Sequence, residues 1–146
     1  MDKELKKRLM ETIQDHLYNF EGYSKGINPR FLSYEDGVAS GDVELKPEFL
    51  NPMGTAHGGF ISTLIDLFGG IPIAMHSNKD YDFEEKMSTL SMNINFLGRN
   101  TQNIIKWDSS VIKYGNHIRV SHVNLYDGDN GLIADGVATY YVVGKK

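Results

Sequence analysis

Apolar residues recur at helical spacing near the start of the chain. Leu5, Leu9, Ile13 and Leu17 lie four residues apart, which predicts a helix over residues 2–20 with one apolar face. Glycine and proline between residues 22 and 29 break this pattern, so we expect the helix to end before them.

A second, more apolar helix is predicted over residues 57–75. Its apolar stripe is suited to packing on a sheet and consists of Phe60, Ile61, Leu64, Ile65, Phe68 and Ile71. The opposite side is small and polar, so another backbone or a ligand could approach it closely; it consists of Gly59, Ser62, Thr63, Asp66, Gly69 and Gly70. Pro72 and the two preceding glycines are expected to loosen the end of this helix.

Strand patterns fill most of the remaining chain. Residues 38–45 indicate a strand, residues 46–56 a loop, and the polar residues 76–86 a mobile loop. Residues 88–97 alternate, with Leu90, Met92, Ile94 and Phe96 on one face and Thr89, Ser91, Asn93 and Asn95 on the other. Three more strands are predicted at 104–114, 117–127 and 132–143, with a hairpin turn at 127–131. One long helix followed by antiparallel strands predicts an α+β fold in which the sheet curls around the helix.

Composition narrows the possible functions. A chain of 146 residues suggests one domain, with an N-terminal helix at 1–21 and a core over about 31–143. The absence of cysteine excludes disulfides, a thiol nucleophile and thiolate metal sites, and the net charge of −4 argues against a nucleic-acid partner. His117 and His122, five residues apart on a predicted strand, should face opposite sides, so we expect no metal site.

We also expect no membrane partner, because no stretch approaches the apolar length of a membrane span. The lysine-rich N-terminus lacks the apolar segment of a signal peptide. The expected location is cytoplasmic, with a mitochondrial or other intracellular site left open.

Residues 51–59 carry the most specific chemistry. They read Asn-Pro-Met-Gly-Thr-Ala-His-Gly-Gly and lead into the second helix. A helix N-terminus presents unpaired N–H groups and the positive end of the helix dipole, so it can hold an anion or polarise a carbonyl. Gly58 and Gly59 have no side chains to keep a ligand away from these amides. Asp66, eight residues after Gly58, offers a carboxylate that could be a base or a nucleophile.

The spacing of these two groups has a further consequence. At about 1.5 Å per residue, the Gly58 amide and Asp66 lie roughly 12 Å apart along one helix. The Asp66 side chain leans toward the N-terminus and recovers only part of that distance. One substrate carbonyl can hardly touch both groups of one chain. If they work together, they should come from two subunits related by a two-fold axis.

These motifs resemble the signature of hotdog-fold acyl-CoA thioesterases, most closely the phenylacetate-pathway (PaaI-like) and thioesterase-superfamily-member branch. The signature is Asn51, Gly54, His57-Gly58-Gly59 and Asp66, and the likeness continues through residues 92–96 and 113–116, covering about residues 35–143. It implies a hotdog fold, a long central helix wrapped by a curved antiparallel sheet, here with an extra N-terminal helix. It also implies an acyl-CoA substrate, no cofactor, and a homodimer that forms the active site and is often paired into a homotetramer.

The resemblance assigns roles residue by residue. The Gly58 amide would polarise the thioester carbonyl, and the partner subunit's Asp66 would activate water or attack directly. Asn51 would help to place the reacting groups, His57 would shape the turn and contact the thioester region, and Thr89 would orient the water or the acid. Two segments align with coenzyme A contacts, and their basic residues would meet the phosphates: Phe96, Leu97, Gly98, Arg99 and Asn100, and Lys113, Tyr114, Gly115, Asn116 and His117.

Each assignment has a simpler competitor. Asn51 could only cap its loop, His57 could only start the helix, and Thr89 could be an ordinary strand residue. Asp66 could be solvent-exposed, and Arg99 and Lys113 could be surface cations. The competing function is a non-catalytic acyl-CoA or lipid-binding module with the same fold; the presence of Asp66 favours the enzyme.

Overall fold

The computed structural model describes residues 1–77 and 86–143. Its helices are α1 (Lys3–Asn19), the short 3-10 helix η1 (Pro47–Phe49) and α2 (Gly58–His76). Its strands are β1 (Arg30–Glu35), β2 (Val38–Glu44), β3 (Lys86–Phe96), β4 (Ile104–Tyr114), β5 (Ile118–Asp127) and β6 (Leu132–Val143). The loop predicted over 76–86 falls mainly on residues 78–85, which lie outside the described residues.

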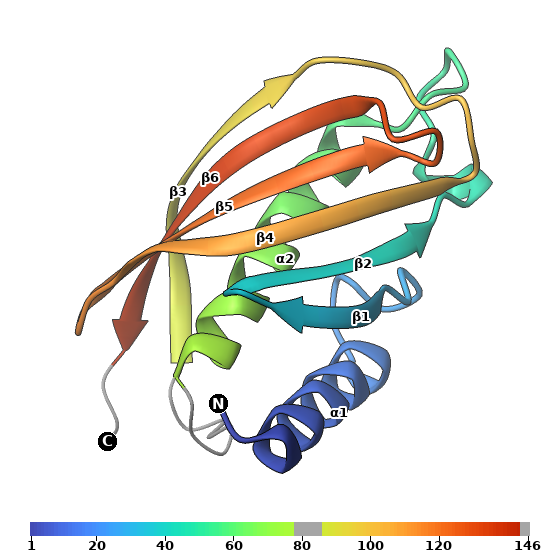
Figure 1. Ribbon diagram of the computed structural model, residues 1–146. Helices are drawn as coiled ribbons and strands as arrows, with labels where there is room; N and C mark the ends of the chain where they lie inside the picture. The colour runs from blue at the N-terminus through green and yellow to red at the C-terminus, as the bar shows by residue number, and fades with distance from the viewer. Residues whose placement is uncertain (78–85, 144–146) are drawn as a thin grey trace.

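The six strands pair antiparallel in the order β1-β2-β4-β5-β6-β3, and the sheet curves around α2 (Figure 1). Helix α1 lies beside β1, at one edge of the sheet. The predicted hotdog arrangement is therefore confirmed: a central helix is wrapped by a curved antiparallel sheet, with an extra helix at the N-terminus.

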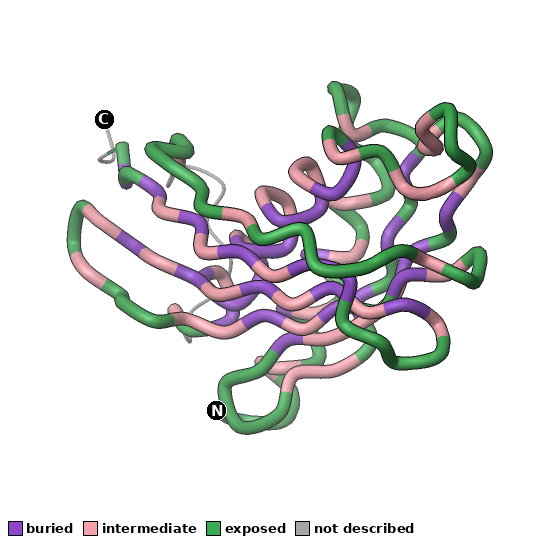
Figure 2. Tube along the Cα trace, turned by 90° about the horizontal axis from the view of Figure 1, so that it is seen from above, coloured by how far each residue is buried: buried purple, intermediate pink, exposed green. Residues whose placement is uncertain are grey.

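Helix α2 fills the concave side of the sheet and carries much of the core. Its predicted apolar stripe is buried, and Phe68 stacks on Trp107 of β4 with ring centroids 4.3 Å apart. Along β5 and β6, buried residues alternate with less buried ones, as Figure 2 shows, because one face of the sheet covers this helix. Pro72 does not end the helix, which continues to His76 with Ile73 and Met75 buried in its last turn.

Gly69, on the predicted small and polar face of α2, is buried, because the Tyr140 side chain of β6 packs closely against it. The expectation that no stretch has the apolar length of a membrane span is wrong. Helix α2 has that length and composition, with 19 residues and a mean hydropathy of 1.5. Of this apolar window, 61% is buried inside the fold, so packing against the sheet accounts for its composition.

Strand β3 departs from the strict alternation predicted for it. Thr89 pairs with Tyr140 and Ser91 pairs with Thr139, so Leu90 is an extra residue and forms a β-bulge. Residues directly opposite across a ladder share a face. Thr89 therefore lies on the helix side of the sheet, like Met92 opposite Ala138, whereas the strict alternation predicts opposite faces for these two residues.

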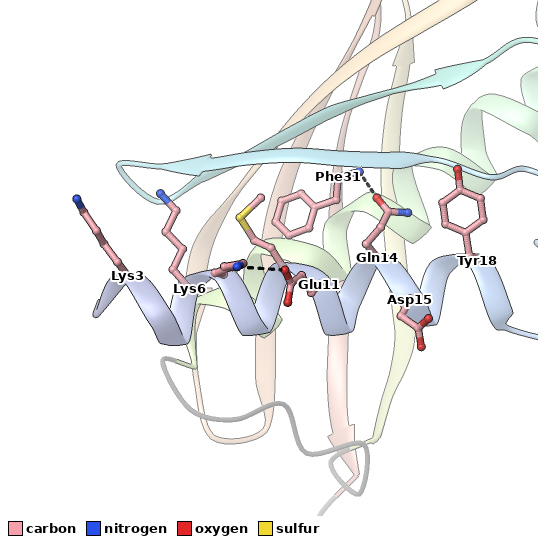
Figure 3. A pocket seen from close by; sticks show the side chains of 9 residues that line it. Lys3, Lys6, Glu11, Gln14, Asp15, Tyr18 and Phe31 are labelled. Atoms are coloured by element: carbon pink, nitrogen blue, oxygen red, sulfur yellow. Dashed lines mark hydrogen bonds and ion pairs between the residues drawn. The ribbon is translucent and has the colours of Figure 1, made fainter.

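Strand β1 was not predicted, and α1 supports it through one polar side chain. The Gln14 Oε1 atom accepts a hydrogen bond from the Phe31 N–H at 2.6 Å (Figure 3). Its Nε2 atom donates to the Pro29 carbonyl at 2.9 Å. The side-chain amide thus pairs with the backbone at the edge of β1 much as a neighbouring strand would. An open groove of about 760 Å³ lies here between α1 and Phe31, away from the predicted site residues.

Candidate active site

The backbone amide of Gly58, at the N-terminus of α2, is free of partners among the described residues. His57 is the N-cap, and its Nδ1 atom accepts a hydrogen bond from the Gly59 N–H at 2.8 Å. The Gly58 N–H donates to no other group in the part of the chain that the structure describes. Because His57 satisfies the second amide, the first one remains available to a ligand at the positive end of the helix.

Asn51 organises the loop that precedes this turn. Its Oδ1 atom accepts hydrogen bonds from the backbone N–H groups of Met53 at 3.0 Å and Thr55 at 3.1 Å. Its Nδ2 atom donates to the Thr55 hydroxyl at 3.0 Å. The loop-capping interpretation therefore describes most of what this side chain does, although Asn51 also lines the pocket at the free amide.

A pocket of about 200 Å³ lies at the Gly58 turn. It gathers Asn51, Gly58, Phe96, Gly98, Arg99 and Asn100 from segments that are far apart in the sequence. A Cβ atom added at Gly58 would lie 3.6 Å from the Phe96 ring, so that ring forms the wall facing the helix start. Asn100 Oδ1 accepts a hydrogen bond from the Ala56 N–H at 2.7 Å and ties the loop after β3 to the loop before α2.

The loop that carries Arg99 and Asn100 is fixed at its far end by Asp127. This carboxylate is 1% exposed and accepts hydrogen bonds from the Thr101 N–H at 2.9 Å, the Thr101 hydroxyl, and the Gln102 N–H at 3.0 Å. Burial acts to raise the pKa of Asp127, but these hydrogen bonds outweigh it and hold the pKa below its ordinary value. The charged carboxylate therefore keeps one wall of the pocket in place.

Asp66 lies two turns further along α2, outside this pocket. It is partly buried, and its Oδ1 atom accepts a hydrogen bond from the Thr89 hydroxyl at 2.7 Å. An Asp66 that was only exposed to solvent would not need a hydrogen-bond partner on a neighbouring strand. The structure therefore brings together the acid and the hydroxyl that the family resemblance associates, and the bulge in β3 turns Thr89 toward the helix.

The segment 113–117 forms the turn between β4 and β5, at the other end of the sheet from the Gly58 pocket. The His117 carbonyl accepts from the Val142 N–H at 2.8 Å, near the end of β6, whereas Phe96 pairs with Ala134 near its start. Lys113 and Arg99 are both exposed, and neither forms an ion pair or a hydrogen bond with any described residue. Tyr114 of this turn packs between His76, with ring centroids 4.6 Å apart, and the guanidinium of Arg119, 4.1 Å from its ring centroid.

Within one chain, the predicted site residues thus fall into two groups. We call the first the amide group: Asn51, His57, Gly58, Phe96, Leu97, Gly98, Arg99 and Asn100. We call the second the carboxylate group: Asp66, Thr89, Lys113, Tyr114, Gly115, Asn116 and His117. The first gathers at the start of α2 and the end of β3, and the second lies toward the opposite end of the sheet.

Sequence reasoning missed two residues that hold these groups in place. Asp127 was noted only as part of a turn, and Tyr140 only as part of the last strand. The Tyr140 hydroxyl donates to the main-chain carbonyl of Asp66 at 2.7 Å, across 74 residues of sequence. No spacing rule in a single sequence connects residues so far apart. Among the described residues, no group of three or more His, Cys, Asp or Glu side chains is placed to hold a metal ion.

Comparison with known proteins agrees with this geometry. The family model described as thioesterase superfamily matches residues 53–134, more than half of the chain. The chain belongs to the thioesterase superfamily. The match includes the Gly58 turn, Asp66, Thr89 and both segments aligned with coenzyme A contacts.

Individual relatives of this superfamily member cover nearly its whole length. A relative from Saccharolobus solfataricus, whose provisional name is esterase, is 27% identical over 137 residues, which are 94% of each chain. A structure from Shewanella oneidensis, described as related to the thioesterase superfamily, has a TM-score of 0.80 at 21% identity and covers 97% of this chain and 100% of that one. A Streptococcus mutans protein bound to acetyl-CoA has a TM-score of 0.71 at 26% identity and covers 90% of this chain and 98% of that one.

Proposed function

We propose that this member of the thioesterase superfamily is an acyl-CoA thioesterase of the PaaI-like branch, which hydrolyses a thioester to a free carboxylic acid and coenzyme A. The observation that carries the proposal is the pairing of a free amide at Gly58 with a carboxylate at Asp66 held by Thr89. A thioester hydrolase needs both a donor for the developing oxyanion and a base or nucleophile.

The chemistry follows from these two groups. The Gly58 N–H donates to the thioester oxygen, which gains negative charge as the carbonyl carbon becomes tetrahedral. Asp66 either takes a proton from the attacking water or attacks the carbon itself, in which case water then cleaves the acyl-enzyme. The carbon–sulfur bond breaks, and the thiolate of coenzyme A leaves and takes up a proton. No metal or cofactor takes part in this proposal.

A homodimer would bring the two groups together. Strand β3 is at an edge of the sheet, and its outer edge pairs with no described strand. Its side chains and the next residue expose large apolar groups, namely Leu90, Met92, Phe96 and Leu97 at 37–59% exposure. Antiparallel pairing of β3 with its copy about a two-fold axis would bury this apolar edge. The start of one β3 would then meet the end of the other, so the carboxylate group of one chain would lie near the amide group of its partner.

The coenzyme A moiety would lie along this shared boundary. Arg99 and Lys113 have no other described partner, so each is available to a phosphate of the substrate. They lie at opposite ends of one sheet, and the same two-fold axis would bring Arg99 of one chain toward Lys113 of the other. The acetyl-CoA bound to the Streptococcus mutans relative supports this class of ligand. We further propose a cytoplasmic enzyme whose dimers pair into tetramers.

One experiment separates this function from the binding-module alternative. A panel of short-chain, long-chain and aryl acyl-CoAs is incubated with the protein, and the released thiol is detected with a thiol reagent. The enzyme should release thiol from at least one class, and Asp66→Asn should abolish the release. Asp36→Asn is the matched control, because Asp36 lies in an exposed turn at φ 51°, a conformation that asparagine accepts. Tight binding of acyl-CoA without thiol release would support the binding module instead.

A further inference from the structure

We infer that Tyr140 is a positioning residue for the reaction, because its hydroxyl fixes the turn of α2 that carries Asp66. This inference rests on the proposed function. Tyr140 is 4% exposed, and its hydroxyl donates to the Asp66 carbonyl at 2.7 Å. In a helix this carbonyl normally accepts only from the N–H four residues later, so the tyrosine adds a tertiary bond at the residue that bears the acid.

Two strands hold Asp66 at two different atoms. Tyr140 of β6 and Thr89 of β3 are directly opposite each other in the ladder. The threonine hydroxyl binds the carboxylate of Asp66, and the tyrosine hydroxyl binds its main-chain oxygen. One pair of cross-strand residues therefore holds both the side chain and the main chain of Asp66.

Gly69 makes this contact possible. A Cβ atom at this position would lie 2.2 Å from the Tyr140 oxygen and 3.2 Å from the ring carbon that bears it, so only glycine lets the hydroxyl reach the helix. Burial and the nearby negative charge of Asp66 raise the pKa of Tyr140 far above its ordinary value. The hydroxyl therefore stays protonated and can donate this hydrogen bond at neutral pH.

Position matters here because Asp66 must reach a carbonyl held by another subunit. Reacting groups must be held close to the productive geometry, and a misplacement of about 1 Å can cost on the order of 10²-fold in rate. A tyrosine that fixes the helix turn should therefore act on kcat and not on the binding of coenzyme A, because its hydroxyl bonds to the main chain of Asp66 and not to a residue of the proposed coenzyme A contacts.

The test is Tyr140→Phe, which removes one oxygen and keeps the ring in the core. We expect kcat per folded active site to fall about tenfold, with KM changed less than about twofold. Tyr126→Phe is the matched control: it also removes a hydrogen-bonded tyrosine hydroxyl, here one bonded to the carboxylate of Asp108 on the outer face of the sheet. This control should leave kcat unchanged.

A second pair of variants tests the Tyr140 contact even if Tyr140→Phe alone lowers the folded fraction. Gly69→Ala should lower kcat because its new methyl group collides with the Tyr140 oxygen. Adding Tyr140→Phe removes the colliding atom, so the double variant should be no worse than Gly69→Ala alone. A purely structural role would lower the melting temperature or the folded fraction of Tyr140→Phe while kcat per folded site stayed at the wild-type value.

The outcomes distinguish this inference from the proposed function. If the wild-type protein releases no thiol from any acyl-CoA, the proposed function is wrong. If the wild type is active and Asp66→Asn is inactive, but Tyr140→Phe retains the full kcat, only the positioning role of Tyr140 is wrong. The positioning role would also be wrong if Gly69→Ala and Tyr140→Phe each lowered kcat and the two factors multiplied in the double variant.

Discussion

The Thr89 hydroxyl donates to the Asp66 carboxylate at 2.7 Å, across 23 residues of sequence and from a strand to the central helix. This contact exists because Leu90 is an extra residue in β3, which turns Thr89 to the helix side. A local irregularity in the sheet thus decides whether the proposed catalytic acid has a partner.

Thr89→Ala should lower kcat by about tenfold, because a hydrogen bond to a charged group contributes about 1.5–3 kcal/mol and only part of this acts in the transition state. The loss should be smaller than that of Asp66→Asn, since the hydroxyl only orients the acid. Thr89→Ser keeps the hydroxyl and serves as the control. Steady-state kinetics on the best acyl-CoA measures both variants, and equal activity of the alanine and wild-type proteins would show that the contact is only structural.

Gly58→Pro should remove the proposed oxyanion donor without breaking α2. Gly58 is the first residue of the helix, where proline is well tolerated. His57 already has φ −63° and ψ 138°, a conformation compatible with a following proline. Loss of one such donor typically lowers kcat by about 10²–10³. Gly58→Ala keeps the N–H and is the matched control; circular dichroism checks the helix. Full activity of the proline variant would exclude the amide as the donor.

Structural features set by neighbouring residues could be predicted from the sequence, whereas features set by contacts between distant segments could not. The apolar stripe of α2 and the alternation of the later strands predict the core, because burial imposes their periodicities. Strand β1 was not predicted, because its sequence, Arg-Phe-Leu-Ser-Tyr-Glu, does not alternate cleanly. Its edge is completed by Gln14 from a helix distant in sequence. The bulge at Leu90 was not predicted, because it depends on the pairing of β3 with β6, and a local sequence pattern does not contain that pairing.

The site divides in the same way. The Gly58 turn and Asp66 are close in sequence and were predicted from local helix chemistry. Asn100 was named only through the family resemblance. Asp127 and Tyr140 act on that site through hydrogen bonds to segments distant in sequence, so one sequence gives no sign of their roles.

Asp127→Asn should lower the free energy of unfolding at neutral pH. It should also make that free energy fall less when the pH is lowered. The folded pKa of Asp127 lies below its unfolded value, so its contribution to stability is fully present above the unfolded pKa of about 3.9. This contribution is lost as the pH falls through the folded pKa. Melting temperatures at neutral pH and below pH 4 should show the larger change on acidification in the wild type, with Asp36→Asn as the control. Equal acid dependence of the wild type and the Asp127 variant would contradict this account.

Charge reversal at Arg99 and Lys113 should raise KM for acyl-CoA with little change in kcat. Each cation would meet a phosphate of the substrate, so a glutamate there replaces attraction by repulsion. The effect should weaken with added salt, because exposed charges are screened. Lys3→Glu, on the exposed face of α1, is the control for each single reversal, because it makes the same change in net charge. An unchanged KM in the double reversal would leave both residues as ordinary surface charges.

Mixing two inactive variants tests whether the active site is shared between chains. Asp66→Asn should lower kcat by about 10²–10⁴ while leaving folding intact, and Gly58→Pro should be similarly impaired. In a heterodimer of the two, the Gly58 amide of the first chain meets the intact Asp66 of the second. One of its two sites is therefore complete, and the other lacks both groups. Mixed and re-equilibrated subunits should recover activity from about half of the sites in the heterodimers. The control mixes Asp66→Asn with the double variant Asp66→Asn/Gly58→Pro, in which no combination completes a site. If both groups acted within one chain, every mixture would stay inactive, because each chain would lack one of them.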